Sequence, residues 1–199
     1  MPATFLLIRH AAHGDLQRRL VGRMAGIHLD AAGQAQADRL ALALAGRGIA
    51  RLQSSPRERA LETAAAIAAR TELAIEAVAA ADEIDAGNWT GQSFDALAND
   101  PAWRRWNSAR SHARPPGGES MRELQERVMG HLTTTARERT RGSIAIVTHA
   151  EPIRAAVLHC LGKSCDAFAE IDIAPASTTT IAVSGVGAQV VALNELPPS

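Results

Sequence analysis

The chain of 199 residues contains no tyrosine, and aromatic residues make up only 3% of it. Small aliphatic residues must therefore fill most of the interior, which favours helices packed closely on a sheet. The only cysteines are Cys160 and Cys165. The sequence allows a disulfide between them, but we favour two free thiols in a reducing compartment. The length fits one domain over residues 1–199, which can bury a core without disulfides or metal.

The chain also lacks an excess of charge of either sign. Its 21 basic and 21 acidic residues give a net charge of +0, which argues against a general attraction to nucleic acid or to membranes. All basic residues except Lys163 are arginines, so an anion site would be a local cluster of guanidinium groups. No charged segment followed by a long apolar run opens the chain, and no apolar stretch could span a bilayer. The sequence therefore predicts a soluble, cytoplasmic protein with no membrane or nucleic-acid partner.

Short apolar runs alternate along the chain with segments of helical periodicity. The runs typical of strands cover residues 4–8, 49–53, 73–79, 143–148, 170–174 and 178–193. The segments typical of helices cover residues 30–45, 54–70, 93–97, 100–107, 119–140 and 152–161. Asp30 is the expected N-cap of the first helix, and Ser54-Ser55-Pro56 is expected to open the second. This alternation predicts an α/β protein with a mostly parallel sheet covered on both faces.

Two apolar strands end abruptly in polar residues. The run over residues 5–8 stops at Arg9 and His10, and the run over residues 144–148 stops at His149. In open α/β sheets, ligands bind in the crevice beyond the carboxyl ends of the strands. Phosphoryl transfer needs positive donors, an in-line nucleophile and a proton for the leaving oxygen. Arginine and histidine can supply the donors and the nucleophile, and a carboxylic acid such as Glu83 can supply the proton.

Six short motifs follow one another in an order that is typical of one family. They are Arg9-His10-Ala11, Leu29 to Ala37 with its Gly33, Ser54 to Ala64 with Arg59, Glu83 to Gly91, Pro115 to Ser120, and Val147-Thr148-His149-Ala150. Together they resemble the histidine phosphatase superfamily, also called phosphoglycerate mutase-like, in a phosphatase-type branch with a variant Arg-His-Ala motif. The resemblance implies a three-layer α/β/α sandwich with a mostly parallel central sheet.

The resemblance implies a role for each matched residue. His10 would be the nucleophile that becomes phosphohistidine, and Arg9, Arg59 and His149 would bind the phosphoryl oxygens. Glu83 would protonate the leaving group and then activate the attacking water.

Glutamic acid can donate a proton near neutral pH only if its pKa is raised. For Glu83, burial or carboxylate neighbours such as Asp82 and Asp85 could raise it, and the sequence leaves these causes open.

The chain departs from the family's pattern directly after each histidine. Ala11 and Ala150 stand where glycine is usual, and a methyl group is tolerated there only if the backbone has ordinary dihedral angles.

The loop after His10 also differs. Leu16 occupies a position at which the family often has a phosphate-contacting asparagine, and Asp15 would repel a phosphate unless an arginine such as Arg19 offsets it. His13 could line the pocket or simply lie on the loop. Arg57 is expected to be a surface residue rather than a ligand.

The implied activity is a metal-independent phosphomonoester hydrolase that acts through phosphohistidine on a small phosphorylated metabolite and needs no cofactor. A phosphoglycerate mutase-type transfer is the first alternative, but the short segment between the acidic motif and Glu119 favours a phosphatase. A non-catalytic phosphate-binding protein is the second. A metallohydrolase with His10, His13 and His149 as ligands is the third, although no typical metal-ligand spacing supports it.

Residues 85–118 are expected to face the substrate and to vary with it. Trp89, Trp103 and Trp106 in this segment are expected to pack its short helices rather than stack on a ligand. The sequence identifies neither the substrate nor the oligomeric state, and it is compatible with a homodimer.

Overall fold

The structure is a computed structural model that describes residues 2–138 and 140–198. The described residues form a six-stranded sheet in the order β3-β2-β4-β1-β5-β6. The strands are β1 (Ala3–Arg9), β2 (Ile49–Ser54), β3 (Ile75–Ala77), β4 (Ser143–Thr148), β5 (Thr178–Ser184) and β6 (Gly187–Glu195). The first four strands pair in parallel, whereas β5 and β6 form an antiparallel hairpin at one edge. The prediction of a mostly parallel sheet is therefore confirmed.

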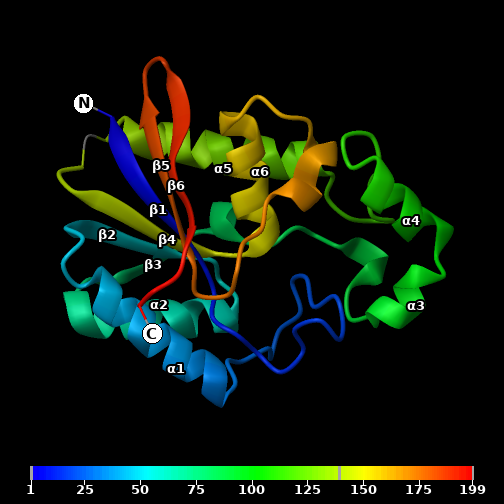
Figure 1. Cartoon of the computed structure of the whole chain (residues 1–199), viewed down its shortest axis with the longest axis horizontal. Coiled ribbons are helices and arrows are strands. Elements are labelled where there is room, and N and C mark those ends of the chain that lie inside the picture. The colour runs from blue at the N-terminus through cyan, green and yellow to red at the C-terminus, as the bar shows by residue number, and fades with distance from the viewer. Residues whose placement is uncertain (1, 139, 199) are drawn as a thin grey trace.

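Helices cover both faces of the sheet, so the predicted three-layer α/β/α sandwich is confirmed (Figure 1). The α-helices are α1 (Ala31–Leu44), α2 (Glu58–Thr71), α3 (Phe94–Ala98), α4 (Pro101–Ser108), α5 (Met121–Ala136) and α6 (Ala150–Cys160). Short 3₁₀ turns cover η1 (Ala79–Ala81), η2 (Gly87–Trp89) and η3 (Cys165–Glu170). In Figure 1, α1 and α2 lie on one face, α5 and α6 lie on the other, and α3 and α4 project beyond one end of the sheet. No helix in the described part of the chain combines the length and the apolar character needed to cross a membrane.

The two faces of the sheet bury separate cores because successive side chains of a strand point in opposite directions. On β1, Phe5 and Leu7 join the cluster under α5 and α6, whereas Leu6 and Ile8 join the cluster under α1 and α2. All four side chains are almost completely buried. The central strand is therefore apolar and buried from Phe5 to Ile8, and its polar residues Thr4 and Arg9 stand near its two ends.

Asp30 caps α1 as the sequence predicts, because its carboxylate accepts a hydrogen bond from the backbone N–H of Gly33 at 2.7 Å. A Cβ atom on Gly33 would lie 1.9 Å from the carbonyl oxygen of Ala12. The absence of a side chain at Gly33 therefore lets α1 begin against the loop that follows β1.

The predicted helix over residues 119–140 is shorter than expected, and Arg139 lies outside the described residues. Helix α5 begins at Met121, after Ser120 and Glu123 form a reciprocal capping box, and it ends at Ala136. Glu119 therefore lies outside the helix, where Arg127 donates to its carboxylate.

The predicted start of the second helix at Ser54 is wrong. Ser54 is still part of β2, where it pairs with Val147, and the backbone N–H of Ser55 donates to the Val147 carbonyl at 2.8 Å. Helix α2 begins only at Glu58, and its N-cap residue Arg57 makes no capping bond through its side chain. Neighbouring strand β4 thus extends β2 beyond the point at which serine and proline predict a helix.

The predicted strand over residues 170–174 is also wrong, and the third strand is shorter than the predicted 73–79. Ile171 and Ile173 are buried, but their backbone carbonyls accept hydrogen bonds from arginine side chains instead of from a neighbouring strand. Apolar β-branched residues here fill the core without joining the sheet.

Candidate active site

The carboxyl ends of β1 and β4 bring Arg9, His10 and His149 to one edge of the sheet. The two strands are parallel neighbours with Arg9 opposite Thr148, and the N–H of His10 donates to the Thr148 carbonyl at 2.9 Å. The imidazole rings of His10 and His149 consequently lie 5.0 Å apart between centroids. The structure therefore brings together the two strand-end histidines that the sequence singles out.

The His10 ring has one orientation that its neighbours impose. Its Nδ1 lies 2.8 Å from the carbonyl oxygen of Ala11, which can only accept, so Nδ1 carries the proton. The lone pair of the ring is then on Nε2, where Nε of Arg59 donates to it at 3.2 Å. Burial, together with the charges of Arg59 and Arg9, holds the pKa of His10 well below its usual value. His10 is thus a neutral imidazole whose unprotonated Nε2 accepts from Arg59 at the site.

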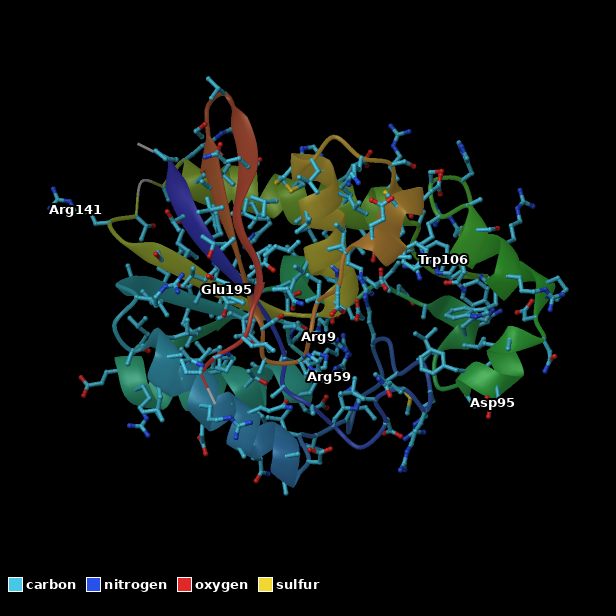
Figure 2. The ribbon with its side chains drawn as sticks, viewed as in Figure 1. Arg9, Arg59, Asp95, Trp106, Arg141 and Glu195 are labelled. Carbon is cyan, nitrogen blue, oxygen red and sulfur yellow. The ribbon has the colours of Figure 1, made fainter. Side chains whose placement is uncertain are left out.

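Arg59 comes from the first turn of α2 and is completely buried. Its Nη2 donates to the Gly22 carbonyl at 2.8 Å and lies 3.0 Å from Nδ1 of His149. Since a guanidinium group can only donate, Nδ1 of His149 accepts and the ring proton sits on Nε2. Figure 2 shows the side chains of Arg9 and Arg59 in the region beyond the end of β1, and the charges of both act on His10.

A short chain of hydrogen bonds holds the other side of His149. Nε2 of His149 lies 2.7 Å from Oγ of Ser55, and that hydroxyl donates to Oδ1 of Asp82 at 3.2 Å. Arg57 donates to the same carboxylate from Nε and Nη2. Arg57, expected to be a surface residue rather than a ligand, is partly exposed and holds Asp82 in place; that it is no ligand stays a prediction.

Three buried nitrogen atoms mark the place where an anion would fit. Among the residues that the structure describes, four side-chain nitrogen atoms are buried without a hydrogen-bond partner: Nε of Arg9, Nη1 of Arg59 and Nδ1 of His13 in the site, and Nε of Arg110 outside it. Another nitrogen of Arg9, Nη1, donates to the Ile173 carbonyl at 2.6 Å, which fixes the guanidinium group. Because buried polar groups almost always have partners, the three nitrogen atoms in the site indicate a ligand that supplies acceptor oxygens.

Glu83 is the carboxyl group with the most unusual environment in the site. Burial, followed by the negative charge of Glu151, raises its pKa to about 7 against the opposing effects of the Ile84 backbone N–H and the charges of Arg59 and Arg9. The carboxylate neighbour that matters is therefore Glu151 on α6 rather than Asp82 or Asp85. A carboxyl group with such a pKa can both donate and accept a proton near neutral pH.

The alanines beside the two histidines have ordinary backbone conformations. In the described part of the chain, the non-glycine residues with positive φ are Gln17, Glu72, Ala176 and Asn194. Ala11 is fully buried in the core under α1 and α2, and its N–H donates to Oγ1 of Thr63 at 3.0 Å. The methyl groups at Ala11 and Ala150 therefore cause no backbone strain.

The loop after β1 contributes His13 to the site. Its ring centroid lies 5.4 Å from that of His10, and only 3% of the residue is exposed. Burial and the charge of Arg59 lower the pKa of His13 to about 4, so this imidazole is neutral as well. Asp15 and Arg19 lie further along the loop and pair with each other at 2.7 Å, so the arginine offsets the carboxylate.

A cavity of about 260 Å³ lies between the site and helices α3 and α4. Its lining residues are Leu20, Ile84, Ala86, Trp89, Phe94, Trp103, Trp106, Arg110, Pro115, Glu151 and Arg154. The Trp89 ring packs edge-on against Trp103 at 5.2 Å and against Trp106 at 6.3 Å, so the tryptophans pack the short helices as predicted while they also line the cavity. That they do not stack on a ligand stays a prediction. The cavity borders the site through Ile84, which directly follows Glu83, and through Glu151, whose charge acts on Glu83.

Within residues 2–138 and 140–198, no group of three or more histidine, cysteine, aspartate or glutamate side chains is arranged to hold a metal ion. The expectation that the reaction needs no metal stays a prediction.

Sequence reasoning missed four residues that hold or tune the site: Ser55, Thr63, Asp82 in its pairing with Arg57, and Glu151. Ser55 and Thr63 lie inside the motif that carries Arg59. The motif therefore points to these two positions, but it does not show that Ser55 contacts His149 or that Thr63 contacts Ala11. Glu151 lies two residues after His149, and only this spacing pointed to it.

Comparison with known proteins gives a consistent result. A family model described as the histidine phosphatase superfamily (branch 1) matches residues 5–196. An uncharacterized protein of Mycobacterium tuberculosis is 35% identical over 163 residues, which cover 79% of this chain and 78% of that protein. Phosphoserine phosphatase 1 of Hydrogenobacter thermophilus is 29% identical over 82% of this chain and 78% of its own. The solved structure of Bacillus stearothermophilus YhfR has the same fold, with a TM-score of 0.90 over 98% of both chains and 24% identity.

Proposed function

The chain belongs to the histidine phosphatase superfamily, and on this premise we propose that it hydrolyses a small phosphorylated metabolite through a phosphohistidine formed on His10. The observation that carries the proposal is the unprotonated Nε2 of neutral His10, which accepts from Nε of Arg59, while Nη1 of the same guanidinium group is buried without an acceptor. This arrangement supplies a nucleophile and a phosphate site at the same point. The similarity to a phosphoserine phosphatase supports hydrolysis over a mutase reaction.

In the first step, Nε2 of His10 attacks phosphorus and the bond to the ester oxygen breaks. Arg9 and Arg59 donate to the phosphoryl oxygens, whose charge is largest in the transition state. The protonated Glu83 gives its proton to the leaving alkoxide, which departs as an alcohol. Its raised pKa keeps that proton in place near neutral pH.

In the second step, water attacks phosphorus and the bond to Nε2 breaks. The Glu83 carboxylate takes a proton from this water, so inorganic phosphate leaves and the acid is restored. The Ala11 carbonyl keeps the Nδ1 proton of His10 in place throughout, so the same nitrogen receives and releases the phosphoryl group.

Two further imidazoles complete the proposed phosphate site. Ser55 and Asp82 orient His149 as a positioning pair, and His149 contributes to the pocket from β4. Nδ1 of His13 is the third unpartnered nitrogen and would donate to a phosphoryl oxygen. Asp15 and Arg19 stay a mutually neutralised pair on the loop, at the margin of the substrate site.

The decisive test is the covalent intermediate. Wild-type protein incubated with ³²P-labelled phenyl phosphate and quenched in alkali should carry base-stable, acid-labile label, and His10→Ala should carry none. His159→Ala is the matched control, since this histidine is exposed on α6 and should leave labelling unchanged.

The same incubation separates the alternatives. Release of inorganic phosphate that a chelator does not reduce is the expected result. Loss of activity on chelation, restored by a divalent ion, would support a metallohydrolase instead. Isomerisation of phosphoglycerate that depends on a bisphosphorylated primer, with little phosphate release, would support a mutase. Absence of both label and turnover would leave a phosphate-binding protein.

A further inference from the structure

The cavity beside Glu83 has the chemistry of a binding site for the organic part of the substrate. Resting on the proposed phosphatase activity, we propose that this cavity selects phosphomonoesters whose alcohol carries an apolar, planar ring, and disfavours amino alcohols such as serine.

The walls of the cavity are mostly aromatic or aliphatic. Its volume of about 260 Å³ is close to the lower end of the range for small-molecule sites, roughly 300 to 1,000 Å³, and suits a single ring better than a large ligand. Trp89 and Trp106 are buried behind its surface, whereas Leu20, Phe94 and Trp103 are partly exposed. Ring faces and aliphatic carbons of this kind gain most from burying another apolar group.

The indole N–H of Trp89 already has a hydrogen-bond partner and is not available to a ligand in the cavity. It donates to Oδ2 of Asp100 at 2.9 Å, so the ring presents its apolar surface. A polyol in this cavity would lose water contacts without finding equivalent partners on this wall.

The carboxylate at the end of the cavity is already paired with two arginines, although Nε of Arg110 is buried there without a hydrogen-bond partner. The two oxygens of Glu151 accept from Nη1 of Arg154 at 2.9 Å and from Nη1 of Arg110 at 2.7 Å. The guanidinium group of Arg110 also lies over the Phe168 ring at 3.4 Å from its centroid. Two arginines against one carboxylate leave this end positive, with no unpaired carboxylate oxygen for an ammonium group. This is the reason that we expect serine phosphate to bind poorly.

The position of the cavity fits the direction of the reaction. Ile84 lines it directly after Glu83, and Glu151 belongs both to its wall and to the surroundings that raise the Glu83 pKa. An alcohol that receives its proton from Glu83 would therefore extend from the phosphate site into this space.

The first test compares two esters of primary alcohols, so that the leaving groups are of one class. We expect kcat/KM for 3-phenylpropyl phosphate to exceed that for glycerol 3-phosphate by at least about tenfold, since one methylene in an apolar pocket already changes specificity by roughly 10- to 200-fold. O-phosphoserine should be no better than glycerol 3-phosphate. Leu20→Ala should lower the ratio about threefold or more, mainly through KM. The matched control Leu42→Ala, at an exposed leucine on α1, should leave the ratio unchanged.

The second test measures binding without turnover. All three tryptophans of the chain line this cavity and tyrosine is absent, so intrinsic fluorescence reports on the cavity alone. In His10→Ala, 3-phenylpropyl phosphate should change the tryptophan emission and saturate at concentrations at least about tenfold lower than glycerol 3-phosphate.

The two tests separate this inference from the proposed function. Hydrolysis of both esters at similar kcat/KM, with no effect of Leu20→Ala, would overturn the inference and leave the phosphatase proposal intact. Selective binding by fluorescence, with no hydrolysis of any ester, would support the cavity's preference and overturn the phosphatase proposal.

Discussion

At the scale of the residue, the proton on each buried imidazole is set by a neighbour that can only accept or only donate. The Ala11 carbonyl places the proton of His10 on Nδ1, and the Arg59 guanidinium places that of His149 on Nε2. The two histidines at the sheet edge therefore differ in tautomer although they come from similar strand ends. This difference separates the proposed nucleophile from the histidine that completes its pocket.

Glu83→Gln tests the general acid through the leaving group and through pH. Glutamine cannot donate a proton to an alkoxide, so hydrolysis of an alkyl phosphate should slow by about 10²- to 10⁴-fold. Hydrolysis of p-nitrophenyl phosphate should slow much less, because its leaving group needs no proton. Since Glu83 must be protonated in the first step and has a pKa of about 7, wild-type kcat/KM for the alkyl ester should fall as pH rises above about 7.

In Glu83→Gln that alkaline decline should be absent. Glu126→Gln, at an exposed position on α5, is the control and should keep the wild-type profile. Equal losses for both esters would argue against Glu83 as the acid.

At the scale of the element, helices and central strands could be predicted because their signals are local. A few neighbouring residues are enough to predict the apolar strand β1 and the N-cap of α1. The start of α2 and the segment over residues 170–174 could not be predicted in the same way. In both cases partners distant in sequence decide the backbone, namely β4 for Ser54 and arginine side chains for Ile171 and Ile173.

Gly33→Ala tests how the start of α1 supports the loop after His10. The new methyl group would meet the Ala12 carbonyl at 1.9 Å, and this contact is with the backbone rather than with the end of a flexible side chain. Such overpacking costs typically 1–3 kcal/mol, so urea unfolding should show a loss of about 2 kcal/mol or more, together with lower activity. Gly46→Ala is the matched control, since a Cβ there meets no atom within 4 Å, and its stability should change by about 0.5 kcal/mol or less. Similar stability of the two variants would contradict this account.

At the scale of the whole molecule, the sequence identified the residues of the site better than the contacts that tune them. Arg9, His10 and His149 could be placed at one edge because parallel strands end together. The contact of Ser55 with His149 joins positions 94 residues apart, and the effect of Glu151 on Glu83 joins two different elements. Only the folded chain brings these groups together, so a motif can mark them but cannot assign their partners.

The same buried groups make the stability of the whole molecule depend on pH in a direction that can be worked out. His10, His13 and His149 have pKa values below that of an unfolded histidine, through burial and the nearby arginines. Below about pH 6.5 the unfolded chain therefore binds more protons at these positions than the folded chain does. Each proton that only the unfolded chain binds lowers the free energy of unfolding by up to about 1.4 kcal/mol per pH unit. Glu83 acts in the opposite direction, since its raised pKa lets the folded state hold a proton that the unfolded state has released.

We therefore expect the free energy of unfolding, measured with urea, to fall as pH is lowered from about 7 to about 5. His13→Gln removes one proton that only the unfolded chain binds. The free energy of unfolding of this variant should therefore fall less steeply with decreasing pH, with a slope smaller than that of the wild type by about 1 kcal/mol per pH unit. Glu83→Gln removes the opposing proton, so its stability should fall more steeply than that of the wild type. Leu42→Ala, at an exposed residue that does not titrate, should keep the wild-type slope. A shallower slope in Glu83→Gln, or an unchanged slope in His13→Gln, would mean that these groups do not have the protonation states on which the proposed reaction depends.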